Sequence, residues 1–122
     1  TKEALMAGIK TAKGGKRGGD IGSAIERVAA PYSYGIVDAL AGHGVGYEVH
    51  EMPYVPNFGE AGKGNILKPG MVLAIEPMFN LGTKQVVLDN DDYTYRTADG
   101  LPSAHFEHTV LITKGDAEIL TV

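Results

Sequence analysis

The 122-residue sequence contains no cysteine, which excludes disulfide scaffolds, thiolate zinc sites, iron–sulfur clusters and cysteine nucleophiles. Any metal ion must therefore be bound by histidine, aspartate or glutamate. Basic residues are also few, because 11 lysines and arginines against 15 acidic residues give a net charge of -4, which argues against a dedicated nucleic-acid-binding protein. No apolar run approaches the roughly 20 residues of a membrane span, and no secretory signal is present, so we expect a cytoplasmic protein.

The length and the glycine content describe the scaffold. We expect 122 residues to form one domain with one core. The 17 glycines exceed average usage, and glycine permits sharp turns and close backbone approach, so a site built from loops is expected. A basic cluster runs against the acidic balance. We interpret it as a solvated surface, with contact to a partner as the alternative, and it comprises Lys10, Lys13, Lys16 and Arg17.

Helical periodicity is confined to the first 30 residues. Residues 1–12 place Leu5 and Ile9 at helical spacing, which predicts a short helix. A glycine-rich turn is expected over residues 13–19. A second helix is predicted over residues 21–30, with Asp20 as its N-cap.

Strands are predicted for most of the remaining chain. The run 71–79 is almost entirely apolar and is typical of a strand buried on both faces. Residues 42–46 are too rich in glycine for a strand interior and are interpreted as a loop, and residues 53–64 as irregular. The other expected strands are 36–40, 86–88, 93–97, 105–113 and 117–121. Two helices followed by mostly antiparallel strands predict an α+β fold, with the helices backing one face of a sheet.

Two carboxylates lie in these predicted core strands. Glu76 sits within the apolar run 71–79, where burial of a carboxylate costs several kcal/mol unless it is paired, protonated or bound to a metal. Strand alternation places Glu107 on the same face of the last long strand as His105. Each carboxylate alone is explained by a buried ion pair or by backbone N–H donors. Metal coordination is the alternative.

His43 favours metal coordination over the structural explanation of these carboxylates. A histidine together with two carboxylates from separate strands is the ligand chemistry of Zn, Mn, Fe or Co in a hydrolytic site. His50 follows seven residues later, and its spacing fits a further ligand, a general acid or base, or a surface residue equally well.

Five short segments, in this order, resemble the C-terminal half of type I methionine aminopeptidases. They are residues 42–46 (GHGVG), 50–53 (HEMP), 68–71 (KPGM), 75–78 (IEPM) and 103–109 (SAHFEHT). The resemblance covers nearly the whole chain and implies half of the pita-bread fold, in which two pseudo-symmetric α+β halves enclose a dinuclear metal site. It also implies removal of the initiator methionine from nascent proteins, with residues 1–122 as the C-terminal half of the catalytic domain.

The resemblance also implies roles for individual residues. His43 and Glu76 would bind one metal ion, and Glu107 would bridge two ions. His50 would contact the scissile amide, Glu76 would shuttle the proton, and Tyr93 would line the methionine pocket. The ions in this family are divalent Co, Mn, Fe or Zn. The family's two aspartate ligands lie upstream of the loop histidine and have no counterpart here, so one ion or none is expected on this chain.

Two features of the sequence leave alternatives to this assignment: a loop shared with prolidases and a histidine at position 105. Prolidases and proline aminopeptidases share the GHGVG loop, but they typically have glycine after Glu-Pro and an Arg-x-Glu-Asp pattern in the last strand. This chain has Met78 and residues 106–109 (FEHT) there, so an Xaa-Pro peptidase ranks second. His105 stands where the family usually has glutamine. It is interpreted as an extra ligand, a donor to the bridging carboxylate, or a neutral replacement.

The partners follow from the expected half-fold. Peptides or nascent chains beginning with methionine are the implied substrates, and the basic cluster would contact the ribosome if it is exposed. Half of a pseudo-symmetric fold exposes apolar surface, which predicts pairing with an N-terminal half or with a second copy of the chain. A non-catalytic binding module with the same half-fold is the remaining alternative. No membrane or specific nucleic-acid partner is expected.

Overall fold

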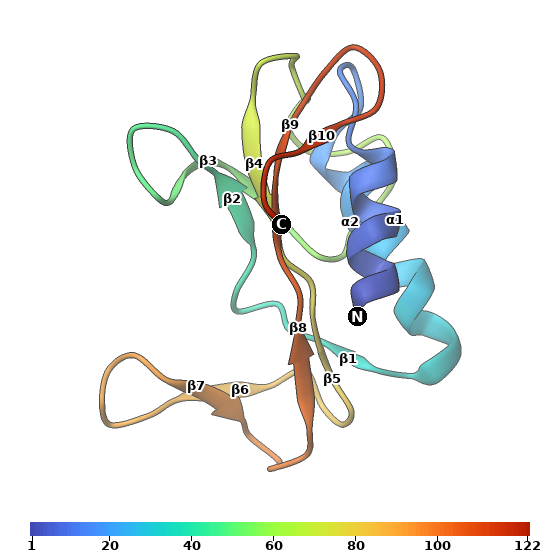
Figure 1. The fold of residues 1–122 in the computed structure, drawn as a ribbon. Coiled ribbons are helices and arrows are strands. Elements are labelled where there is room, and N and C mark those ends of the chain that lie inside the picture. The colour runs from blue at the N-terminus through green and yellow to red at the C-terminus, as the bar shows by residue number, and fades with distance from the viewer.

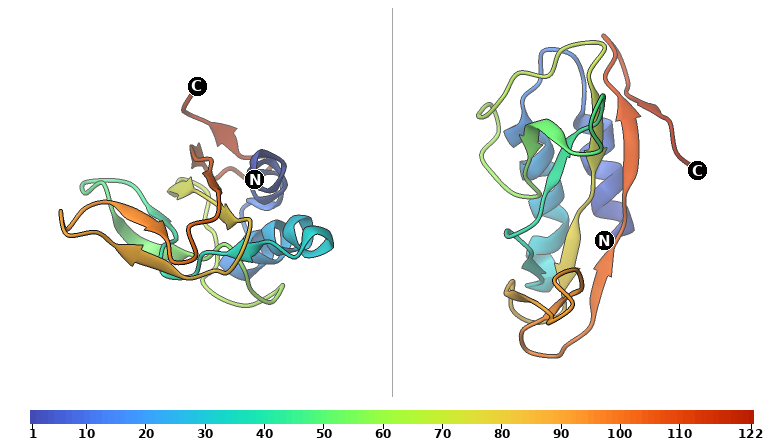
Figure 2. Two further views of the ribbon diagram at one scale, coloured as in Figure 1. Left: turned by 90° about the horizontal axis from the view of Figure 1, so that it is seen from below. Right: turned by 90° about the vertical axis from the view of Figure 1, so that its left-hand side faces the viewer.

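The computed structural model describes residues 1–122 as two helices followed by a series of short strands (Figure 1). Helix α1 spans Lys2–Thr11 and helix α2 spans Gly18–Ala29, with a 3-10 turn, η1, at Ala30–Tyr32. The helices pack side by side against one face of the strands, as two views at right angles show (Figure 2). Neither helix has the length and apolar content that a membrane crossing requires.

The strands form three antiparallel groups. The largest has the order β10 (Glu118–Ile119), β9 (His108–Leu111), β4 (Val72–Ile75), β2 (Gly42–Gly44) and β3 (Glu51–Val55). A second sheet has the order β1 (Gly35–Ile36), β5 (Met78–Asn80) and β8 (Ser103–His105). The hairpin of β6 (Val86–Leu88) and β7 (Tyr95–Thr97) projects from the body (Figure 1). The α+β fold class predicted from the sequence is confirmed.

The core lies between the two helices and the five-stranded sheet. The predicted apolar stripes of the helices face inward, and aliphatic side chains of β4 and of the segment around β9 meet them from the sheet. The largest buried members are Leu5, Ile21, Ile25, Leu73, Ile75 and Ile112. This layer holds the central strands in place, and the site residues lie on those strands or at their ends.

Helix α2 begins earlier than the sequence predicted, and Asp20 is not its N-cap. Arg17 is the N-cap, and the Asp20 carboxylate inside the first turn accepts a hydrogen bond from the Arg17 backbone N–H at 2.8 Å. The other oxygen of Asp20 accepts from the Gly62 N–H at 2.8 Å. A Cβ added to Gly19 would lie 2.2 Å from the Glu60 carbonyl oxygen, so this glycine permits the loop to pack on the helix.

Two predicted long strands are each divided between the two main sheets. The run 71–79 forms β4 and β5, separated at Glu76–Pro77, and the run 105–113 contains the end of β8 and the whole of β9, separated at Phe106–Glu107. Proline has no N–H to continue a ladder, which accounts for the first break. Each break carries one of the two singled-out glutamates.

The predicted loop over residues 42–46 is instead a central strand. Its residues 42–44 form β2, which pairs with β3 and β4, and part of the predicted irregular segment belongs to β3. A Cβ at Gly42 would lie 2.3 Å from the Ala74 carbonyl oxygen, and one at Gly44 would lie 2.2 Å from that of Met52. The glycines therefore allow close approach of neighbouring strands. The predicted strands 36–40 and 117–121 are shortened to β1 and β10.

Candidate metal centre

Three predicted ligand residues converge in the structure. One ligand atom from each of His43, Glu76 and Glu107 lies within 4.8 Å of the corresponding atoms of the other two. Strand register explains the convergence, because Ala74 pairs with His43 on one side and with Thr109 on the other. Extending the antiparallel register by two residues brings Glu76 opposite Glu107. The three side chains thus come from β2, the β4–β5 break and the β8–β9 break.

The tautomer of His43 prepares this residue to bind a cation. Its Nδ1 lies 2.9 Å from the Gly44 carbonyl oxygen, which only accepts, so Nδ1 carries the proton. In the neutral ring, Nε2 then presents a lone pair, and it faces Glu76 Oε1 at 3.3 Å. The two side chains are only 14% and 13% exposed. Two acceptors facing each other at this distance require a proton or a cation between them, and the donor set suits a divalent metal.

Glu76 has further contacts that fix its position. His105 Nε2 lies 3.1 Å from Glu76 Oε2, the carboxylate oxygen that does not face His43. The buried side chain of Asn57 donates from Nδ2 to the backbone carbonyl of Glu76 at 3.2 Å. The hydrogen bond to Glu76 is the main reason that the pKa of His105 is raised above its usual value, and partial burial opposes this shift. Of the roles considered for His105, donation to Glu107 is not observed.

A cavity of about 400 Å³ opens beside these residues. Its lining combines polar side chains, among them His50, Glu76, Arg96 and His105, with an apolar wall that includes Leu40 and Met78. The ring of His50 lies 4.1 Å from the ring of His43, measured between centroids, which brings the second predicted histidine to the same place. A cavity lined by both polar and apolar side chains can hold a substrate with an apolar side chain next to a reacting polar group.

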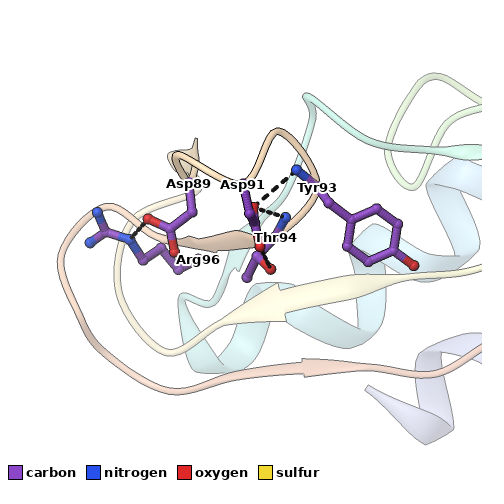
Figure 3. A network of polar contacts seen from close by, with 5 residues as sticks. All are labelled: Asp89, Asp91, Tyr93, Thr94 and Arg96. Carbon is purple, nitrogen blue, oxygen red and sulfur yellow. Dashed lines mark hydrogen bonds and ion pairs between the residues drawn. The ribbon is translucent and has the colours of Figure 1, made fainter.

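Tyr93 is not among the residues that the structure brings together here. It lies in the turn of the β6–β7 hairpin, where the residue is 85% exposed, and its N–H donates to Asp91 Oδ1 at 3.0 Å. Figure 3 shows the ring pointing away from that contact. Tyr95, in β7, lines the cavity instead. Both tyrosines lie in the strand predicted over residues 93–97, and no sequence feature distinguishes them, because the placement of the hairpin decides which one faces the site.

Asn57 is the other residue that sequence reasoning missed. It lies in a segment interpreted as irregular, and its polar side chain gave no signal of burial. The structure buries it to 1% exposure against the Glu76 backbone. A buried amide of this kind is found only when the loop after β3 is placed against the β4–β5 break.

Comparison with known proteins agrees with this geometry. Residues 1–114 match the model of metallopeptidase family M24. The chain belongs to this family. The M24 family binds divalent metals, which is the chemistry that the His43, Glu76 and Glu107 donor set fits.

Individual M24 relatives place the chain more finely. It is 50% identical over 123 residues to the methionine aminopeptidase of Aquifex aeolicus, covering 99% of this chain and 48% of that protein. The crystal structure of methionine aminopeptidase from Rickettsia prowazekii superposes with a TM-score of 0.95 at 41% identity, covering 100% of this chain and 50% of that one. A prolidase from Pyrococcus horikoshii gives 0.72 at 30% identity, covering 99% and 29%.

These M24 comparisons identify the fold and show how much of the relatives' length the chain spans. The structural neighbours have the pita-bread fold, and the two helices with antiparallel sheets correspond to part of it, as the resemblance implied. The chain spans about half the length of the curated relatives it matches. Identity and structural similarity are both higher for methionine aminopeptidases than for the prolidase, so the Xaa-Pro peptidase alternative is not favoured.

Proposed function

We propose that this chain is the C-terminal half of a methionine aminopeptidase catalytic domain, which hydrolyses the bond after an N-terminal methionine. The observation that carries the proposal is the convergence of His43, Glu76 and Glu107, whose ligand atoms lie within 4.8 Å, beside a cavity with an apolar wall. An active hydrolytic site requires this convergence, whereas a purely structural half-domain does not.

The donor set would hold divalent Co, Mn, Fe or Zn, with His43 and Glu76 on one ion and Glu107 shared with a second. Such an ion lowers the pKa of water and polarises a carbonyl, and two carboxylates offset its charge. His43 supplies a neutral nitrogen, because its Nδ1 is committed to the Gly44 carbonyl. The two ligands of the second ion that the family carries would have to come from outside these residues.

The other polar residues act on the substrate. Glu76 would accept the proton released as water attacks the peptide carbonyl and would return it to the leaving amine. His50 lines the same cavity and would donate a hydrogen bond to the scissile amide. The apolar wall, which includes Leu40, Met78 and Tyr95, would accommodate the methionine side chain. Tyr95 takes the place in this proposal that the resemblance gave to Tyr93.

The cellular setting is part of the proposal. Nascent polypeptides beginning with methionine would be the substrates, which places the protein in the cytoplasm. The remaining half of the pita-bread fold would be supplied by an N-terminal half or by a second copy of this chain. Lys10 lies on α1, and Lys13, Lys16 and Arg17 lie between α1 and α2, where a ribosome contact would be made.

The test joins the N-terminal half of the Aquifex aeolicus relative to residues 1–122 and measures methionine release from a Met-Ala-Ser peptide with added Mn²⁺ or Co²⁺. We expect release by this chimera and no detectable release by its Glu107→Gln variant. An Xaa-Pro dipeptide is the comparison substrate. The proposal is wrong if the folded, metal-loaded chimera leaves Met-Ala-Ser intact or prefers the Xaa-Pro dipeptide.

A further inference from the structure

The Glu76 carboxylate lies between two histidines that reach it from different sheets. His43 extends from β2 toward Oε1 at 3.3 Å, and His105, at the end of β8, lies 3.1 Å from Oε2. The two contacts differ in kind. Nε2 of neutral His43 presents a lone pair, because the proton is on Nδ1. The His105 ring contacts the carboxylate through Nε2 and can carry its proton on that nitrogen.

We propose that His105 is a positioning residue for the metal centre: its Nε2–H donates to Glu76 Oε2 and keeps Oε1 turned toward His43 and Glu107. The inference rests on the proposed function, because it takes these three residues as the ligands. A carboxylate held by one oxygen loses little conformational freedom when the other oxygen binds a cation, so the affinity for the cation increases.

The geometry distinguishes positioning from direct ligation. The ligand atoms that lie within 4.8 Å of one another belong to His43, Glu76 and Glu107, and His105 is outside this group. The His105 nitrogen faces the oxygen that points away from His43. Its side chain is 47% exposed, against 13% for Glu76, so the ring approaches the carboxylate from the outer side.

The strand framework holds His105 in this place. His105 in β8 pairs with Met78 in β5. Met78 follows Glu76 by two residues, so this pairing brings His105 close to Glu76. Asn57 fixes the Glu76 backbone by donating to its carbonyl at 3.2 Å. Asn57 therefore holds the main chain of Glu76, and His105 holds its Oε2. Only Oε1, which faces His43, remains for a cation.

The chemistry of the side chain at position 105 follows from this role. A glutamine amide can also donate to a carboxylate from this position, but leucine cannot. His105→Leu therefore removes the donor at similar volume, and His105→Gln restores one. His108 provides the control, because its Nδ1 contacts Thr121 Oγ1 at 2.8 Å and not a carboxylate of the centre.

The test is a Co²⁺ titration of the 122-residue chain, followed by visible absorption and by competition with a chelator. We expect His105→Leu to weaken Co²⁺ binding by about 10- to 100-fold, with an unchanged absorption spectrum at saturation. His105→Gln is expected to recover most of the affinity, and His108→Gln to match the unsubstituted chain. Thermal unfolding of each variant without metal confirms that the fold is intact.

The remaining outcomes separate this inference from the proposed function. Equal affinity in the unsubstituted chain and in His105→Leu overturns positioning, and a changed spectrum at saturation makes His105 a ligand instead. Glu76→Gln tests the centre itself. If Glu76→Gln retains full Co²⁺ affinity, or if the chain joined to the N-terminal half of its relative binds no Co²⁺, the metal centre is wrong. If Glu76→Gln loses Co²⁺ binding and His105→Leu does not change the affinity, the metal centre is supported and only the role of His105 is wrong.

Discussion

The candidate metal centre and the β6–β7 hairpin both place carboxylates next to polar groups, but these groups come from different parts of the chain. In the hairpin turn, Asp91 accepts from the N–H groups of Tyr93 and Thr94 and from the Thr94 hydroxyl, all within three residues (Figure 3). Glu76 instead meets His43 and His105, which lie far from it in the sequence on either side. The hairpin carboxylate is satisfied locally, whereas the site carboxylate depends on the assembled fold and has an oxygen available for a cation.

The largest expected effect comes from removing a ligand. Glu107→Gln removes one charge from the centre, and we expect it to weaken Mn²⁺ or Co²⁺ binding by more than about 100-fold, beyond the typical effect of an outer contact. Glu107 is exposed, so the free energy of unfolding without metal should hardly change. Metal titration and urea unfolding of the same samples measure both quantities. A large loss of stability in Glu107→Gln would contradict the assignment of this residue to metal binding.

The next effect concerns the strand that carries His43. In Gly44→Ala the new Cβ would lie 2.2 Å from the Met52 carbonyl oxygen, so β2 and β3 must separate. We expect the free energy of unfolding to fall by about 3 kcal/mol. Gly115→Ala is the control, because its Cβ meets no atom closer than 3.9 Å. Urea unfolding compares the two, and an equal effect in both variants would show that strand approach at Gly44 is not what requires glycine.

The Asp20 carboxylate combines both kinds of contact. One of its hydrogen-bond donors, Arg17, is close in the sequence, and the other, Gly62, is distant in the sequence. We expect Asp20→Ala to lower the free energy of unfolding by about 1 kcal/mol at neutral pH. The backbone hydrogen bond from Arg17 lowers the pKa of Asp20 below 3.8, so the stabilisation is present above that value and is lost as the pH falls through the folded-state pKa.

Unfolding of Asp20→Ala and of the unsubstituted chain at several pH values checks this dependence. The difference between them should shrink below about pH 4. A difference that stays constant down to pH 2 would assign the effect to something other than the ionised carboxylate.

The smallest effect is expected in the hairpin. Hydrogen bonds from Thr94, the hydroxyl first, lower the pKa of Asp91, but this carboxylate is fully exposed. Asp91→Ala should therefore loosen the turn, lower stability less than Gly44→Ala does, and leave metal affinity unchanged. Amide hydrogen exchange at Tyr93 and Thr94 reports the local opening. A change in Co²⁺ affinity would show that the hairpin is coupled to the centre more closely than its local contacts imply.

Sequence reasoning singled out the three residues that converge in the structure, but it predicted less of their surroundings. His43, Glu76 and Glu107 stood out because each is a polar residue in an apolar or glycine-rich setting, and the ordered motifs connected them. The partner of His105 could not be predicted, since alternation along one strand related it to Glu107 and the structure pairs it with Glu76. The contact of Asn57 with the Glu76 backbone depends on a loop whose path no local pattern specifies.

The sequence by itself determined the features that depend on near neighbours. Apolar spacing placed the two helices, and the strands predicted over residues 86–88 and 93–97 placed the β6–β7 hairpin. Tertiary structure alone decided that the glycines around His43 form a central strand, that the predicted strand 105–113 divides at Glu107, and that Tyr95 faces the cavity. The physical reason is range: helix periodicity and turn chemistry act over a few residues, whereas strand register and sheet boundaries are set by packing between distant segments.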